Sequence, residues 1–409
     1  MFSSVTIPTP EEPQILLPLL QLADHGLALS HEDAPDLYMS NIRKRNPSST
    51  IAPANASQSA SPREEVGRTP LPLSALDLVP LVEGGTSVAA LRAAVELAQA
   101  VDRFGYTRLW YAEHHNMPGI ATTIPEILIA HVGSMTTRIR LGAGGVMLPN
   151  HSPLQVAESY KLLEAIYPGR IDLGIGRAPG TDALTALALR RSRKALTADD
   201  FLEQLGELIA WGSGTFPPDN PFRAVRAMPD DQPLPPLYLL GSSNDGARLA
   251  AEMGVAFAFA GHFSPDSPEV AMHAYRTGFF PNGMLDKPYA ILALSVFCAD
   301  TQEAAERMAS SMLLSFARLR TGHPGRLPSP EEALAHVYTP EEEKIVAFFK
   351  KIRIVGTPEK VRARIQDLAA RSQADEVMIA THAYDPAARM RSYELIAQAF
   401  GLPEFKPSR

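Results

Sequence analysis

The sequence predicts an α/β protein in which eight strand–helix pairs close into a (β/α)8 TIM barrel with insertions. Short apolar stretches of strand length alternate with stretches of helical periodicity, and this alternation runs from near residue 71 almost to the end of the 409-residue chain. Eight parallel strands are the number that closes such a barrel. A doubly wound open sheet is the competing architecture, but eight units in one domain favour the barrel.

The expected strands are short and mostly apolar. We place them at Leu73–Leu81, Arg108–Tyr111, Ile139–Leu148, Arg170–Ile175, Leu237–Leu240, Ala256–Ala260, Tyr289–Cys298 and Glu376–Ala380.

The expected helices lie between the strands and after the last one. The first shows an apolar stripe at Val88, Leu91, Val95, Ala98 and Val101, and Gly105 ends it. We place the helices at Ser87–Phe104, Pro125–Met135, Leu154–Ile166, Ala198–Trp211, Gly246–Met253, Pro268–Phe279, Gln302–Arg318, Pro358–Arg371 and Ala387–Phe400. Two longer connections, Thr181–Ala198 and Gly322–Lys350, are expected to be insertions.

The first 70 residues differ from the rest of the chain. They contain nine prolines and a Ser/Ala/Asn-rich stretch, which cannot bury enough apolar surface to offset the loss of chain entropy. We therefore expect a disordered N-terminal extension over residues 1–70 and a single barrel domain over residues 71–409.

Composition excludes several classes of protein. The net charge is −7 and no basic patch dominates, so we expect no nucleic-acid partner. No apolar run approaches the ~20 residues that span a bilayer, and the acidic start of the chain is unlike a targeting signal, so we expect a cytoplasmic protein away from the membrane. The single cysteine, Cys298, lies in an expected strand and is interpreted as a small buried side chain.

Barrel active sites lie where strands end. After the second expected strand comes Glu113-His114-His115-Asn116, in which alternation along a strand turns one histidine toward the mouth and the other outward. A neutral imidazole at the mouth is a suitable general base. The alternative is a structural histidine pair, with one member bonded to Glu113.

The third strand carries Gly142–Gly145 and is followed by Pro149-Asn150-His151-Ser152-Pro153. A glycine run in a strand permits close approach of a ligand, and here it would form a wall for a flat one. The alternative is a bulge in a barrel strand.

Two later strand ends suit a phosphate group. Arg177 follows the fourth strand, and a planar guanidinium binds phosphate bidentately. Ser242 and Ser243 follow the fifth strand just before a helix, whose free N–H groups bind anions. The alternatives are an ion pair between Arg177 and Asp182 and an ordinary serine N-cap. Together the four strand ends predict a flat, phosphate-bearing cofactor beside a reacting substrate.

Three of these segments, Trp110–His115, Gly142–Pro149 and Gly169–Arg177, resemble the bacterial luciferase-like flavin-dependent monooxygenases. The resemblance extends from about Leu73 to Phe400. It implies non-covalent FMN, reduced by a separate NAD(P)H:flavin reductase. It further implies reaction with O2 to a C4a-peroxyflavin, oxidation of a small or medium organic substrate, and a homodimer.

The resemblance also implies roles for individual residues. His114 matches the catalytic histidine, and Gly144–Gly145 matches a cis peptide bond under the flavin ring. The expected cofactor-binding residues are Gly144, Gly145, Asn150, Arg177, Ser242 and Ser243, and the expected substrate-binding residues are Glu113, His151 and His262.

The chain departs from the family pattern at four positions. Gly176 stands where luciferases carry a reactive cysteine, which argues against light emission. Ser242 replaces an acidic residue, and Gly246 replaces a threonine. Gly261 precedes His262 where related proteins carry two histidines, so the substrate contacts there differ.

Three alternatives to the monooxygenase remain open at this point. They are an F420-dependent hydride-transfer oxidoreductase, a flavin-binding protein without turnover, and a metal-dependent hydrolase that uses His114, His151 and His262.

Overall fold

The computed structural model describes residues 71–197, 200–281 and 284–405. The extension expected over residues 1–70 lies outside these residues. Within them, no helix is both long enough and apolar enough to cross a membrane.

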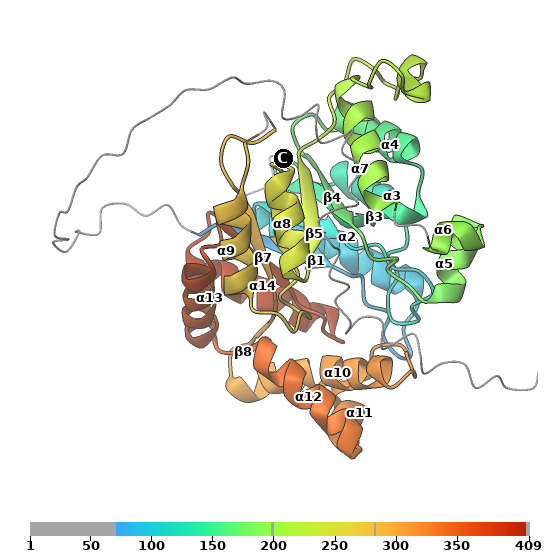
Figure 1. The fold of residues 1–409 in the computed structure, drawn as a ribbon. Helices are drawn as coiled ribbons and strands as arrows, with labels where there is room; N and C mark the ends of the chain where they lie inside the picture. Colours follow the sequence, from blue (N-terminus) through green and yellow to red (C-terminus); the bar gives the residue numbers. More distant parts are fainter. Residues whose placement is uncertain (1–70, 198–199, 282–283, 406–409) are drawn as a thin grey trace, which may run out of the picture. The chain divides into compact units, whose positions relative to one another are not determined.

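The described strands form a closed parallel barrel, as the sequence predicts (Figure 1). Neighbouring strands follow the order β6-β5-β4-β3-β2-β1-β9-β7, and pairing of β6 with β7 closes the ring. The short strand β8 pairs with the far end of β7 and was not predicted. The strands are β1 (Leu73–Asp77), β2 (Arg108–Tyr111), β3 (Arg140–Met147), β4 (Ile171–Gly176), β5 (Leu237–Gly241), β6 (Ala256–Phe259), β7 (Ala290–Cys298), β8 (Ile354–Gly356) and β9 (Glu376–Ala380).

The first strand is shorter than predicted. It ends at Asp77, whose Oδ1 accepts a hydrogen bond from the Val79 backbone N–H at 2.7 Å. Val79 then takes a left-handed φ of 51°, which a strand cannot contain. The expectation of a strand up to Leu81 was therefore wrong, because a side-chain contact turns the chain at Asp77.

Helices follow the strands and cover the barrel (Figure 1). Their bounds agree with the prediction within a few residues. They are α2 (Ser87–Arg103), α3 (Pro125–Gly133), α4 (Pro153–Ile166), α7 (Phe201–Ser213), α8 (Asn244–Glu252), α9 (Pro268–Gly278), α10 (Gln302–Arg320), α13 (Pro358–Ser372) and α14 (Pro386–Phe400).

The buried face of α2 is displaced from the predicted stripe. Val88 is 57% exposed and Leu91 is 37% exposed, although the pattern placed both on the apolar side. The residues that enter the core are Ala94, Leu97, Ala98 and Val101. This set also has helical spacing, so periodicity alone did not determine which face packs on the barrel.

Both expected insertions contain short helices. The connection after β4 holds α5 (Ala183–Arg190) and α6 (Arg193–Thr197), and a 3₁₀ turn (Pro221–Ala224) precedes β5. The connection between β7 and β8 holds α10, α11 (Pro330–Ala335) and α12 (Pro340–Ile352), which lie together in Figure 1. The rings of Phe316 and Phe349 stack at 3.9 Å and fix α12 on α10.

A buried polar cluster fills the amino end of the barrel. Arg108 of β2 donates to Asp172 of β4 at 2.7 Å and to Glu376 of β9 at 2.8 Å. Arg108 also donates to the Tyr238 hydroxyl, and the Tyr289 hydroxyl donates to Glu376. β2 neighbours neither β4 nor β9 in the ring, so these side chains meet inside it. The candidate site lies at the opposite, carboxyl end.

Cys298 is buried in β7, as predicted, and burial raises the pKa of its thiol to about 12. It is an inert core side chain.

Candidate active site at the carboxyl ends of the strands

His114 follows β2 and lies at the carboxyl end of the barrel. Its Nδ1 lies 3.3 Å from the carbonyl oxygen of Gly180, in the loop after β4. Because a carbonyl oxygen only accepts, Nδ1 carries the ring hydrogen and Nε2 keeps a lone pair. Burial lowers the pKa of His114 and outweighs the opposing hydrogen bond to Gly180. The imidazole is therefore uncharged at neutral pH and can accept a proton at Nε2.

Glu113, one residue earlier, is 1% exposed. Its Oε1 lies 2.8 Å from Nε2 of His115 and 2.8 Å from Nε2 of His151. Its Oε2 accepts the backbone N–H of Met147 at 2.9 Å. The alternative interpretation of the sequence was a structural histidine pair with one member bonded to Glu113. That member is His115, while His114 contacts the Gly180 carbonyl oxygen.

The glycine run of β3 contains a cis peptide bond between Gly144 and Gly145, as the family resemblance implied. The register with β4 shifts between Ala143 and Val146. A Cβ added to Gly144 would lie 3.0 Å from Cε3 of Trp110, and one added to Gly145 would lie 2.8 Å from the carbonyl oxygen of Gly174. A side chain at Gly145 would clash with the backbone of β4, and one at Gly144 would crowd Trp110, so both positions favour glycine.

Arg177 is exposed after β4, and within the described part of the chain it makes no hydrogen bond or ion pair. The alternative ion pair with Asp182 was wrong. Asp182 instead accepts from Asn116 at 3.0 Å and from Thr185, and these hydrogen bonds hold the pKa of its carboxyl well below its usual range. The guanidinium of Arg177 is therefore free for a ligand.

Asn150 holds the loop that carries Arg177. Its Nδ2 donates to the carbonyl oxygen of Pro179 at 2.9 Å, and its Oδ1 accepts from Arg190 at 3.3 Å. Both contacts tie the end of β3 to the loop after β4.

The two serines lie between β5 and α8. Ser243 is the N-cap of α8, and its Oγ accepts the Gly246 N–H at a long 3.5 Å. The backbone carbonyl of Ser242 accepts from the Ser264 hydroxyl at 2.6 Å. The capping interpretation is therefore correct for Ser243, and the first N–H groups of α8 face the carboxyl end of β5.

His262 and His382 add two imidazoles at the same end of the barrel. His262 follows β6, and its Nδ1 is buried without a hydrogen-bond partner among the described residues. Burial, reinforced by His114, lowers its pKa to about 4. His382 follows β9, and burial, with contributions from Arg389 and His114, lowers its pKa to about 4 as well. Both rings are uncharged at neutral pH.

Sequence reasoning missed His382. The signal was present, because Thr381 and His382 directly follow the last barrel strand, just as the His114 segment follows β2.

The histidines do not form a metal site. Across the described ranges, no group of three or more His, Cys, Asp or Glu side chains could hold a metal ion. His151 is bonded to Glu113, and the Nδ1 of His262 has no partner in the part of the chain that the structure describes. The three histidines of the hydrolase alternative are therefore not brought together.

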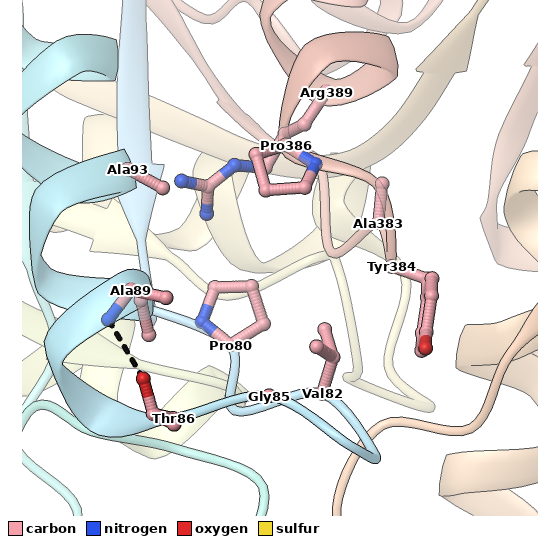
Figure 2. Close-up of a pocket in the computed structure, with 11 residues that line it drawn as sticks. Pro80, Val82, Gly85, Thr86, Ala89, Ala93, Ala383, Tyr384, Pro386 and Arg389 are labelled. Carbon is pink, nitrogen blue, oxygen red and sulfur yellow. Dashed lines mark hydrogen bonds between the residues drawn. The ribbon is translucent and has the colours of Figure 1, made fainter.

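A separate apolar cavity of about 60 Å³ lies between the start of α2 and the start of α14 (Figure 2). Flavin-sized ligands need cavities of roughly 300–1,000 Å³. This cavity is too small for such a ligand and contains none of the predicted site residues. Its lining includes Pro80, Val82, Ala89, Tyr384, Pro386 and Arg389.

Three relatives by sequence resemble the chain over most of its length. It is 44% identical to the protein YvbT of Bacillus subtilis over 328 residues, which cover 80% of this chain and 96% of that protein. It is 42% identical to a luciferase-like monooxygenase of Escherichia coli K12, with coverage of 79% and 95%. It is 35% identical to the N-acetyl-S-alkylcysteine monooxygenase of Bacillus subtilis, with coverage of 80% and 97%.

Solved structures share the fold. Apo-MsnO8 superposes with a TM-score of 0.73 at 34% identity, covering 82% of this chain and 99% of that one. The FMN complex of the oxygenating constituent of 3,6-diketocamphane monooxygenase from Pseudomonas putida has a TM-score of 0.62 at 19% identity, with coverage of 83% and 100%. An F420-dependent secondary alcohol dehydrogenase has a TM-score of 0.57 at 14% identity, with coverage of 81% and 99%. At these last two identities the likeness shows the barrel alone.

A family model described as luciferase-like monooxygenase matches residues 77–376, which include β2 to β7 and every predicted site residue. Since the match covers most of the chain and the relatives above exceed 30% identity over four fifths of it, the chain belongs to the luciferase-like monooxygenase family.

Proposed function

We propose that this protein is an FMN-dependent monooxygenase that uses reduced flavin and O2 to oxidise a small or medium organic substrate. The observation that carries the proposal is the glycine pair Gly144–Gly145, where neighbouring residues leave little room for a side chain, at the same end of the barrel as Arg177, which has no partner among the described residues. A flat ring needs a wall without side chains, and its phosphate needs a free cation. Family membership supports the same conclusion.

The residues at this end of the barrel fit FMN. Arg177 would bind the phosphate together with the first N–H groups of α8, while Ser242 and Ser243 lie beside that helix start. Asn150 would act on the cofactor by holding the loop of Arg177. When bound, reduced FMN supplies the electrons for transfer of one oxygen atom from O2 to the substrate.

His114 is the proposed general base. Its uncharged ring holds a hydrogen on Nδ1 for Gly180 and a lone pair on Nε2 for a proton of the reacting groups.

The proposed substrate contacts are His262 and His382. A buried ring nitrogen without a partner is costly, so a substrate group that hydrogen-bonds Nδ1 of His262 gains affinity. Two uncharged imidazoles favour a polar group such as an amide or carbonyl. The relative that is an N-acetyl-S-alkylcysteine monooxygenase makes N-acetylated thioethers a reasonable first class to test. The carboxylate of Glu113 and the Nε2 of His151 are bonded to each other, so neither is offered here as a direct substrate contact.

Three further features belong to the proposal. A separate NAD(P)H:flavin reductase would supply reduced FMN, in line with the description of a structural neighbour as an oxygenating constituent. A homodimer and a cytoplasmic location stay predictions from the sequence.

The test is oxygen uptake by the purified protein with chemically reduced FMN, over a panel of N-acetylated thioethers, aldehydes, ketones and sulfonates. Substrate-dependent product that carries ¹⁸O from ¹⁸O2 supports the proposal. Oxygen-independent reduction of a substrate with reduced F420, without FMN binding, would replace it with the hydride-transfer alternative. FMN binding without any product across the panel would favour a flavin-binding protein.

A further inference from the structure

We propose that Glu113 is a positioning residue. Its buried carboxylate fixes the position of the base His114 relative to the backbone at Gly144–Gly145, which we call the glycine wall. The inference rests on the proposed flavin function and extends it to a side chain that acts through its neighbours.

The carboxylate joins two loops. Oε1 contacts Nε2 of His115, from its own segment after β2, and Nε2 of His151, from the segment after β3, both at 2.8 Å. Oε2 accepts the N–H of Met147, the last residue of β3, at 2.9 Å. Two of these three hydrogen bonds, those of His151 and Met147, thus connect the end of β2 to the end of β3.

Met147 relates this carboxylate to the glycine wall. It comes two residues after the cis bond between Gly144 and Gly145. A Cβ added to Gly176 would lie 2.8 Å from the Sδ of Met147, so the side chain of Met147 occupies the space beside the last residue of β4. A shift of Met147 would therefore displace the end of β3 that carries the glycine pair.

The same carboxylate constrains the base. His114 lies between Glu113 and His115, which are bonded to each other through their side chains. The His115 N–H donates to the carbonyl oxygen of Gly180, the atom that also contacts Nδ1 of His114. A Cβ added to Gly180 would lie 2.9 Å from the Glu113 carbonyl oxygen, so these segments pack closely.

Each member of the contact between Glu113 and His151 shifts the pKa of the other toward the charged form. Burial raises the pKa of Glu113, but hydrogen bonds from His151, Met147 and His115 and the charge of His151 outweigh it and lower that pKa. Burial lowers the pKa of His151, but Glu113 outweighs it, and the pKa is raised above 6.5. Glu126 of α3 also raises the pKa of His151, and the phenol of Tyr160 in α4 faces the two glutamates.

A purely structural role is the competing explanation, because breaking a buried ion pair destabilises any fold. Glu376 offers a matched control. It too is a buried carboxylate bonded to an arginine and a tyrosine, but it lies at the amino end of the barrel. Replacement of Glu376 tests stability without touching the mouth.

The experiment compares wild type, Glu113→Ala, Glu113→Gln and Glu376→Gln. Dissociation constants for FMN and for riboflavin are measured by quenching of flavin fluorescence over a range of pH, and Tm is measured for each protein. FMN and riboflavin share the ring that the glycine wall would contact. Glu113→Ala should therefore raise the dissociation constants of FMN and riboflavin by the same factor, about tenfold. Glu113→Gln keeps an acceptor oxygen and should recover part of this loss.

The pH profile separates positioning from packing. Wild-type affinity should fall as the pH rises through the raised pKa of His151, above 6.5, because the ion pair is lost there. Glu113→Gln should show no such dependence. Glu376→Gln should lower Tm and leave both affinities and the pH profile at wild-type values.

Two results overturn the positioning role. One is wild-type affinity for both flavins in folded Glu113→Ala. The other is an equal loss of affinity in Glu376→Gln. Failure of the wild-type protein to bind either flavin would instead remove the proposed function, and this inference with it.

Discussion

The Nδ1 atom of His114 lies 3.3 Å from the carbonyl oxygen of Gly180, a residue 66 positions further along the chain. This contact joins the end of β2 to the loop after β4 and selects the ring nitrogen that keeps its lone pair. The chemistry assigned to His114 therefore depends on a backbone atom from another strand end.

Replacing His114 with alanine should reduce turnover by about 10²–10⁴-fold while flavin affinity is kept, because the proposed base is lost and the glycine wall and Arg177 are not. Burial lowers the pKa of His114 below 6.5, so wild-type activity should rise with pH through that lowered value. Product formation measured from about pH 5 to 8 should lack this rise in the variant. Unchanged turnover would remove the assignment of the base.

Replacing Arg177 with alanine should weaken the binding of FMN much more than the binding of riboflavin. A hydrogen bond to a charged group contributes roughly 1.5–3 kcal/mol of binding free energy. Riboflavin has no phosphate, so it does not make this hydrogen bond and cannot lose it. Titration of both flavins measures the difference, with Arg223→Ala, an exposed arginine of the 3₁₀ turn before β5, as the control. Equal losses for the two flavins would show that Arg177 does not bind the phosphate.

Replacing Gly145 with alanine should destabilise the fold and weaken the binding of both FMN and riboflavin. The new Cβ would lie 2.8 Å from the Gly174 carbonyl oxygen, and overpacking of this kind costs about 1–3 kcal/mol of unfolding free energy. Chemical denaturation and flavin titration measure the two effects. Gly325→Ala is the control, since a Cβ there meets nothing within 4 Å. A stable variant with normal flavin affinity would contradict the glycine wall.

His262 and His382 should make the protein sensitive to acid. Their pKa values are about 4 in the fold, against an ordinary value of 6.5. As the pH falls below 6.5, the unfolded state takes up protons before the folded state, so stability is lost progressively down to about pH 4. The doubly substituted protein with His262→Gln and His382→Gln should show a flatter dependence of Tm on pH, whereas His323→Gln, an exposed histidine, should not. Identical profiles for all three proteins would argue against buried neutral rings.

Much of the fold could be predicted because its signals are local. Alternation of apolar strands with helical stripes identified all eight strands of the ring, and the residues that follow each strand end identified the mouth. Strand 1 was predicted too long because the contact between Asp77 and the Val79 N–H is a feature of one turn rather than of a pattern. The short strand β8 was missed because three residues carry no periodicity.

The sequence by itself predicted the barrel and the family, and it marked His114, Arg177 and the glycine pair as candidate site residues, since these depend on residue type and order along the chain. Tertiary structure alone decided three matters. It left Arg177 without a partner among the described residues, because Asp182 is engaged by Asn116 and Thr185. It brought His382, from near the end of the chain, to the carboxyl end of the barrel, where it interacts electrostatically with His114. It also placed Glu113 between His115 and His151. The physical reason is that a closed barrel places strand ends that are distant in sequence next to one another. Which side chains form hydrogen bonds and which charges are buried depends on that arrangement.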